Sequence, residues 1–138
     1  MVLVDFVPPP GRDPVPATAE PRTYRAPSGT AWVVREPSPG PGIVVLSATG
    51  EFDVDSVGCL RRALVEARHS DARQTVLDVS RIGSGDSAFL HELVAAHFAS
   101  GRFVIAGPVP RRLCRLFTVT GTLRMFRIVK DRAALGFA

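Results

Sequence analysis

The chain has 138 residues, of which 46% are hydrophobic and 22% charged. This length is enough for one hydrophobic core and too short for two ordinary domains. The formal net charge of +4 is unevenly distributed, because residues 102–138 hold eight basic residues and only one acid, Asp131. No aromatic residues interleave with these arginines at the spacing of a stacking platform, and no helix-turn-helix or zinc-finger spacing occurs. We therefore expect a solvated basic face and no direct nucleic-acid partner.

The cysteine pattern and the N-terminus bear on location. Cys59 and Cys114 form no C-x-x-C motif, so neither a disulfide framework nor a zinc site is indicated. The first residues lack the basic region and long apolar run of a signal peptide, and no stretch approaches the roughly 20 apolar residues of a membrane span. We expect a cytoplasmic protein without a membrane partner, metal or cofactor, present as a monomer or weak dimer.

The N-terminal segment is rich in proline, with ten of the twelve prolines in residues 1–42. Such a composition buries too little surface to offset the entropy of ordering the chain. We assign residues 1–29 to a flexible Pro-rich tail, in which the alternating Val2, Val4 and Phe6 suit a short docked strand. Residues 30–138 are assigned to one folded domain.

The domain alternates strand-like and helix-like segments. Five apolar, β-branched segments are predicted strands: 30–36, 43–48 (ended by Gly50), 75–79, 103–106 and 123–129. Between them, apolar residues recur at steps of three and four, which predicts helices starting near Asp53 or Asp55, near Asp86 and near Pro110, with a short helical end at 131–135. This order predicts an α/β fold, a mainly parallel mixed sheet of four to five strands with three to four helices.

Three motifs bear on catalytic or nucleotide chemistry. In H-E-L-V-A-A-H at 91–97 the histidines are six residues apart and point about 120° away from each other around a helix, so they do not suit one metal. G-D-S at 85–87 has Phe89 where a nucleophile elbow needs glycine, and G-S-G at 83–85 lacks a Walker lysine. What remains is Ser87 beside Asp86 at a predicted helix start, where either residue could serve only as an N-cap.

The order of elements and five segments resemble one known family. G-E-F-D at 50–53, L-D-V-S at 77–80 and I-G-S-G-D-S-A-F-L at 82–90 resemble conserved segments of the STAS domains of anti-sigma-factor antagonists. The run F-V-I-A-G-P-V-P-R-R-L at 103–113 and the V-T-G ending at Gly121 complete the pattern. The resemblance covers about residues 30–135.

The resemblance implies a binding protein and no enzyme activity. In that family the unphosphorylated protein binds an anti-sigma-factor serine kinase and so frees the sigma factor, and phosphorylation of one serine switches it off. Carried onto this chain, the phosphoacceptor is Ser87. The implied partner-binding residues are Asp53, Ser84, Asp86, Ser87, Ala88, Phe89, Leu90 and His91.

Two alternatives remain at this stage. Where the family usually has small residues after the acceptor, this chain has the bulkier Phe89 and His91. A STAS module that is not phosphorylated, and that senses a ligand or scaffolds a regulatory complex through these two side chains, is the first alternative. A hydrolase with Ser87 as nucleophile is the second.

Overall fold

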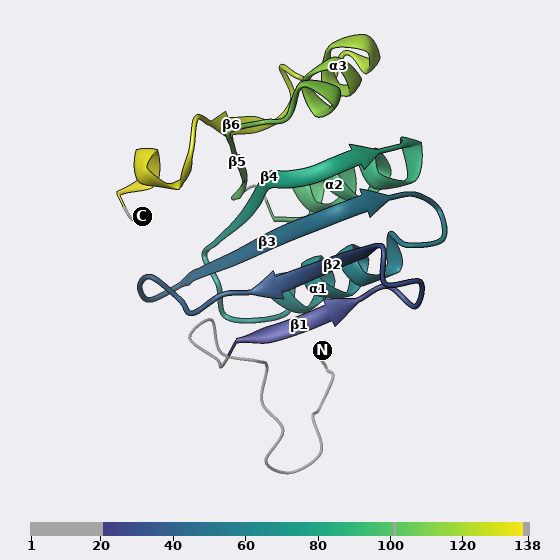
Figure 1. The fold of residues 1–138 in the computed structure, drawn as a ribbon. Helices are drawn as coiled ribbons and strands as arrows, with labels where there is room; N and C mark the ends of the chain where they lie inside the picture. Colours follow the sequence, from purple (N-terminus) through teal and green to yellow (C-terminus); the bar gives the residue numbers. More distant parts are fainter. Residues whose placement is uncertain (1–20, 101, 137–138) are drawn as a thin grey trace.

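The computed structural model describes residues 21–100 and 102–136 (Figure 1). Within this part of the chain, six strands form one sheet in sequence order: β1 (Arg22–Arg25), β2 (Ala31–Arg35), β3 (Ile43–Phe52), β4 (Gln74–Gly85), β5 (Phe103–Ala106) and β6 (Arg127–Val129). The β1–β2 and β2–β3 pairs are antiparallel, and β3 to β6 pair in parallel. The predicted mainly parallel mixed sheet is confirmed.

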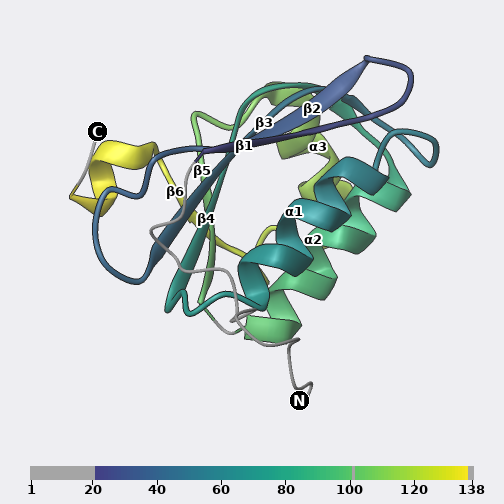
Figure 2. The same cartoon turned by 90° about the horizontal axis from the view of Figure 1, so that it is seen from below.

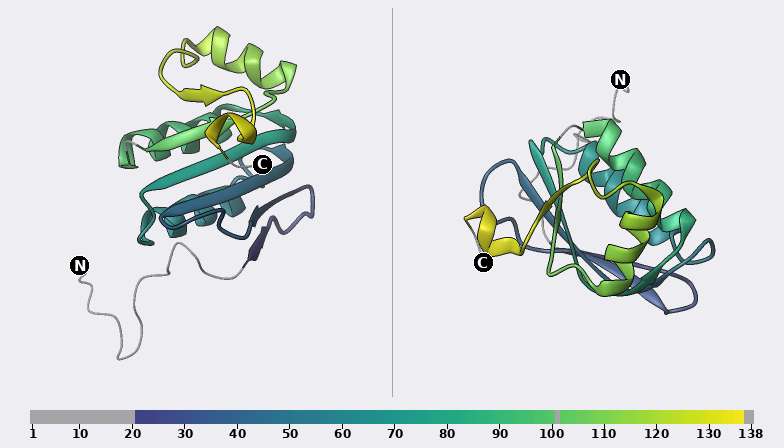
Figure 3. Two further views of the ribbon diagram at one scale, coloured as in Figure 1. Left: turned by 90° about the vertical axis from the view of Figure 1, so that its left-hand side faces the viewer. Right: turned by 90° about the horizontal axis from the view of Figure 1, so that it is seen from above.

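Each parallel connection crosses over through a helix, as parallel pairing requires. These helices are α1 (Gly58–Arg68), α2 (Ser87–Ser100) and α3 (Arg111–Thr120). Figure 2 shows α1 and α2 side by side on one face of the sheet, and the 3-10 helix η2 (Arg132–Leu135) on the other. Figure 3 shows α3 at the β6 end of the molecule. The helix α3 ends at Gly121, which adopts the left-handed conformation at a φ of 75°.

The main core lies between the sheet and the helices. It includes the buried side chains Leu46, Phe52, Leu60, Leu77, Phe89, Leu93, Ile105, Leu113 and Phe117. A smaller cluster of Val45, Val76, Val104 and Ala106 lies on the opposite face, where Leu135 of η2 packs against it. Because both faces are covered at the centre, β4 and β5 are apolar without strict alternation.

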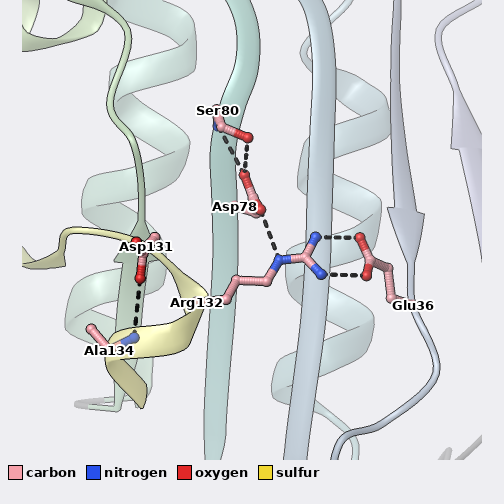
Figure 4. Close-up of polar contacts among 6 residues, drawn as sticks. All are labelled: Glu36, Asp78, Ser80, Asp131, Arg132 and Ala134. Carbon is pink, nitrogen blue, oxygen red and sulfur yellow. Dashed lines mark hydrogen bonds and ion pairs between the residues drawn. The ribbon is translucent and has the colours of Figure 1, made fainter. Parts of the chain in front are cut away.

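An ion-pair network ties η2 to the sheet (Figure 4). The Arg132 guanidinium donates to both carboxylate oxygens of Glu36, and its Nε donates to Asp78 Oδ2 at 2.7 Å. Asp78 Oδ1 also accepts a hydrogen bond of 2.6 Å from the Ser80 hydroxyl. Burial raises the pKa of Glu36, but hydrogen bonds from Arg132 and Ser47 outweigh this effect, so the pKa is lowered overall.

The structure corrects the boundary of the tail. The strand β1 lies inside the segment assigned to the tail, and its Tyr24 is buried and donates a hydrogen bond of 2.8 Å to Glu66 of α1. Arg22 forms an ion pair with the same carboxylate at 2.7 Å. These contacts order a proline-flanked segment. The sheet therefore has six strands, where four or five were expected. The strand suggested for Val2, Val4 and Phe6 lies outside the described residues.

Gly50 was predicted to end a strand, and this prediction is wrong. The strand β3 continues to Phe52, with register shifts against β4 on both sides of Gly50. Gly50 has a φ of 110°, and a Cβ atom there would lie 2.1 Å from the Thr30 carbonyl oxygen. Glycine is therefore required by a bulge where β2 approaches closely. Both β3 and β4 extend beyond their predicted ends, and the site described below lies at these extended ends.

Candidate functional site

The site lies where β3 and β4 end together. Phe52 is paired with Gly85 at the last position of the β3–β4 ladder, and the Asp86 amide donates to the Phe52 carbonyl at 3.2 Å. This bond places the loop of residues 53–57 next to the start of α2. Parallel strands bring their carboxyl ends to the same edge, which is where ligand and partner sites of α/β sheets gather.

Asp86 is the cap of α2. Its Oδ1 accepts hydrogen bonds from the amides of Ala88 at 2.9 Å and Phe89 at 3.1 Å, and its carbonyl accepts the first helical bond, from Leu90. Ser87 is the first residue of the helix and is exposed. No group in residues 21–100 or 102–136 is hydrogen-bonded to its hydroxyl. The capping role is therefore filled by Asp86 and does not account for Ser87.

Asp53 organises the neighbouring loop. Its Oδ1 accepts hydrogen bonds from the Asp55 and Ser56 amides at 2.9 and 3.0 Å, and these backbone bonds hold the pKa of the Asp53 carboxyl below its usual value. The buried Ser56 hydroxyl donates to the Glu51 carbonyl at 2.8 Å. Neither Asp53 nor Asp55 caps α1 as predicted, because the helix begins later, at Gly58, after the N-cap Val57.

Ser84 also lies at this edge, but its hydroxyl is engaged. It donates to the carboxylate of Glu51, a residue that the sequence analysis did not select. A Cβ atom at Gly83 would lie 2.1 Å from Glu51 Oε2, so the glycine leaves room for this carboxylate. The exposed carboxylates around Ser87 are Glu51, Asp53, Asp55 and Asp86, and we call this set the acidic rim.

Phe89 cannot contact a partner directly, which corrects the prediction that it does. Its side chain is 0% exposed, and its ring lies 5.7 Å from the ring of Phe52 in the core. A Cβ atom at Gly85 would lie 2.4 Å from this ring, so the two residues fit together closely. Ala88 and Leu90 are half-buried against the core, whereas His91 is exposed one turn after Ser87.

A large exposed apolar side chain was missed by the sequence reasoning. Val54, at the tip of the loop that Asp53 organises, is 74% exposed. The helical periodicity predicted from Asp53 onward assigned this position to a helix start. The position of Val54 between Asp53 and Asp55 was the sequence signal that could have placed it in an exposed loop.

The histidines do not form a catalytic group with Ser87. His97 is half-buried, with its ring 5.9 Å from that of Phe126, and no histidine of the described chain is hydrogen-bonded to the Ser87 hydroxyl. Within residues 21–100 and 102–136 no three His, Cys, Asp or Glu side chains are placed to hold a metal ion. In the same residues no helix is both long and apolar enough to span a membrane.

Comparison with known families decides the assignment. The family model described as "Mlab, STAS domain" matches residues 40–128, which include every site residue described above. The chain belongs to the STAS domain family. This confirms the resemblance seen in the segments at 50–53, 77–80 and 82–90.

Two solved structures are similar to this STAS domain. One is an anti-sigma factor antagonist from Mycobacterium paratuberculosis, with 22% identity, a TM-score of 0.60, and coverage of 72% of this chain and 86% of that chain. The other is the anti-sigma factor antagonist SpoIIAA in its unphosphorylated form, with 15% identity, a TM-score of 0.57, and coverage of 67% and 84%. At these identities the likeness concerns the fold. No curated protein sequence matches this chain.

Proposed function

We propose that this STAS domain is a cytoplasmic anti-sigma-factor antagonist whose site is switched by phosphorylation of Ser87. The unphosphorylated form binds an anti-sigma-factor serine kinase and frees the sigma factor, and the phosphorylated form does not bind. The observation that carries the proposal is the exposed, unbonded Ser87 hydroxyl at the first position of α2, beside a separate cap, Asp86. Similarity of fold to two anti-sigma factor antagonists supports the same role.

Electrostatics indicates that such a switch acts on binding and leaves folding intact. A phosphate on Ser87 adds a charge of about −1.5 to −2. The N-terminus of α2 favours an anion by about 0.3–1 kcal/mol, which partly offsets repulsion from the acidic rim. Across a docked interface, like charges cost several kcal/mol. The larger effect is therefore on the complex, because a kinase surface that complements the acidic rim suits the charge that the site has before Ser87 is phosphorylated.

The test uses the full chain and the serine kinase recovered with it from the source cell. Incubation with that kinase and ATP should add one phosphate, located at Ser87 by mass spectrometry, and should weaken the complex. Ser87→Ala should bind without being labelled, and Ser87→Asp should bind at least about tenfold more weakly. Ser84→Ala is the matched control, because that serine lies on the same edge with its hydroxyl bonded to Glu51, and it should still be labelled. Wild-type protein that stays unlabelled while binding the kinase would rule out the switch.

A second candidate, a scaffolding STAS module without phosphorylation, is favoured by one observation. The matching family model is described by the name Mlab and not by a sigma-factor role. In this case Ser87→Asp leaves partner binding unchanged. Because Phe89 is buried, the recognition residues of such a module would be Val54 and His91, and replacing either with a charged residue should abolish binding.

A further inference from the structure

The outer face of α3 carries an unpaired basic cluster. Arg111, Arg112 and Arg115 are exposed, and none of them forms an ion pair or hydrogen bond through its side chain within residues 21–100 and 102–136. Val119, on the same helix, is 78% exposed, and Leu123, just after it, is 43% exposed. Arg112, Arg115 and Val119 recur at steps of three and four, so they share one side of the helix. We call these five residues the basic face of α3.

This basic face opposes the stability of its own helix. Arg111 and Arg112 occupy the first turn of α3, where the helix dipole disfavours cations, and that turn contains no acidic residue. The N-cap, Pro110, makes no side-chain capping bond. The helix is anchored from its other side, by the fully buried Leu113 and Phe117. Residues that destabilise their own helix without making a compensating contact are expected at functional surfaces.

We infer that the basic face of α3 is a docking surface for an acidic segment of a protein partner. The three arginines match a row of carboxylates, and the exposed Val119 and Leu123 match an apolar side chain at the end of that segment. This surface differs in charge from the acidic rim around Ser87, so it serves a second contact. The inference does not depend on phosphorylation of Ser87.

Two other classes of partner fit the surface less well. Nucleic-acid surfaces combine basic residues with aromatic side chains that stack on bases, and the basic face has no aromatic residue. A helix that lies in a membrane interface inserts a continuous apolar face, but the apolar side of α3 is already buried against the core. The exposed aliphatic pair at the end of an arginine row instead suits a protein.

The first test measures binding of a synthetic probe by fluorescence anisotropy. The probe is a 14-residue helical peptide with glutamates at steps of three and four and two leucines at one end. The variant Arg111→Glu with Arg115→Glu should bind it at least about tenfold more weakly than wild type. The matched control is Arg68→Glu with Arg81→Glu, which makes the same charge change at two exposed arginines outside α3 and should change affinity by less than about threefold. A probe with glutamine for glutamate should not bind.

The second measurement separates docking from a structural role. Arg111→Glu places an acidic residue in the first turn of α3, where it favours the helix, and Arg115 has no side-chain bond within residues 21–100 and 102–136 that its replacement would break. The α3 variant should therefore melt at the same or a higher temperature than wild type. A lower melting temperature would indicate that the arginines support the fold and would overturn the inference.

Four binding outcomes would also overturn it. The first is an equal loss of peptide binding in the control variant, and the second is no binding of the peptide to wild type. The third is α3-dependent binding of a short DNA duplex, or of phosphatidylglycerol vesicles, that is stronger than peptide binding. The fourth is self-association, measured by sedimentation, that the α3 variant abolishes.

Discussion

Replacing Arg132 with alanine should detach the C-terminal turn from the sheet and lower stability measurably. The guanidinium makes three hydrogen bonds to carboxylates, and bonds to charged groups contribute about 1.5–3 kcal/mol each when well shielded. Here the Arg132 and Glu36 side chains are 23% and 27% exposed, so solvent weakens the interaction. We expect a loss of about 2–3 kcal/mol for the three bonds together, with Glu36 and Asp78 left facing each other.

Urea unfolding followed by the fluorescence of Trp32, the only tryptophan, measures this loss. Arg132→Lys keeps the charge but not the planar fork, and should lose about half as much stability. The pKa of Glu36 is lowered in the folded state, so its contribution is present above the unfolded pKa and is lost as pH falls through the lower folded value. Below about pH 4.5, wild type should therefore lose stability more steeply than Arg132→Ala. Equal urea midpoints at pH 7 for wild type and Arg132→Ala would refute the reasoning.

Three further predictions concern the site and the edge strand. Asp86→Ala removes the cap of α2 and should destabilise by about 1 kcal/mol in urea unfolding, whereas Ser87→Ala should stay within about 0.5 kcal/mol of wild type. Phe89→Ala leaves a cavity in the core and should cost about 3–5 kcal/mol by the same assay, a larger effect than either. Burial, helped by the hydrogen bond to Glu66, raises the pKa of Tyr24 to about 12, so absorbance titration of this sole tyrosine should show late ionisation that Glu66→Gln brings closer to pH 10.

The parallel half of the fold was predictable because its signals are local. Apolar runs such as Thr75–Val79 and the three-and-four spacing of Val57, Leu60 and Leu64 follow from burial on one or both faces. The strand β1 was not predictable in this way. Its order depends on Tyr24 reaching Glu66, a contact across 42 residues that a proline-rich composition conceals. The extension of β3 past Gly50 was missed for a related reason, since glycine ends many strands but here forms a bulge.

The candidate site was predicted in position but not in detail. The placing of Ser87 and Asp86 at a helix start followed from the change of periodicity at residue 86, and the structure distinguishes the cap from the free hydroxyl. The helical spacing of Phe89 and Leu93 already suited a core face, and both side chains are fully buried, but the resemblance assigned Phe89 to partner contact. Glu51 was missed because its role depends on pairing with β4.

The close fit between Gly85 and the ring of Phe89 restricts how this loop can evolve. Any side chain at position 85 would collide with the aromatic ring, so Gly85 cannot be replaced while Phe89 is kept. Because Asp86 and Ser87 lie between them, a relative that loses the phenylalanine while keeping the glycine would have a loosened helix start. The position of Ser87 at the start of α2 therefore depends on the packing of the Phe89 ring against Gly85.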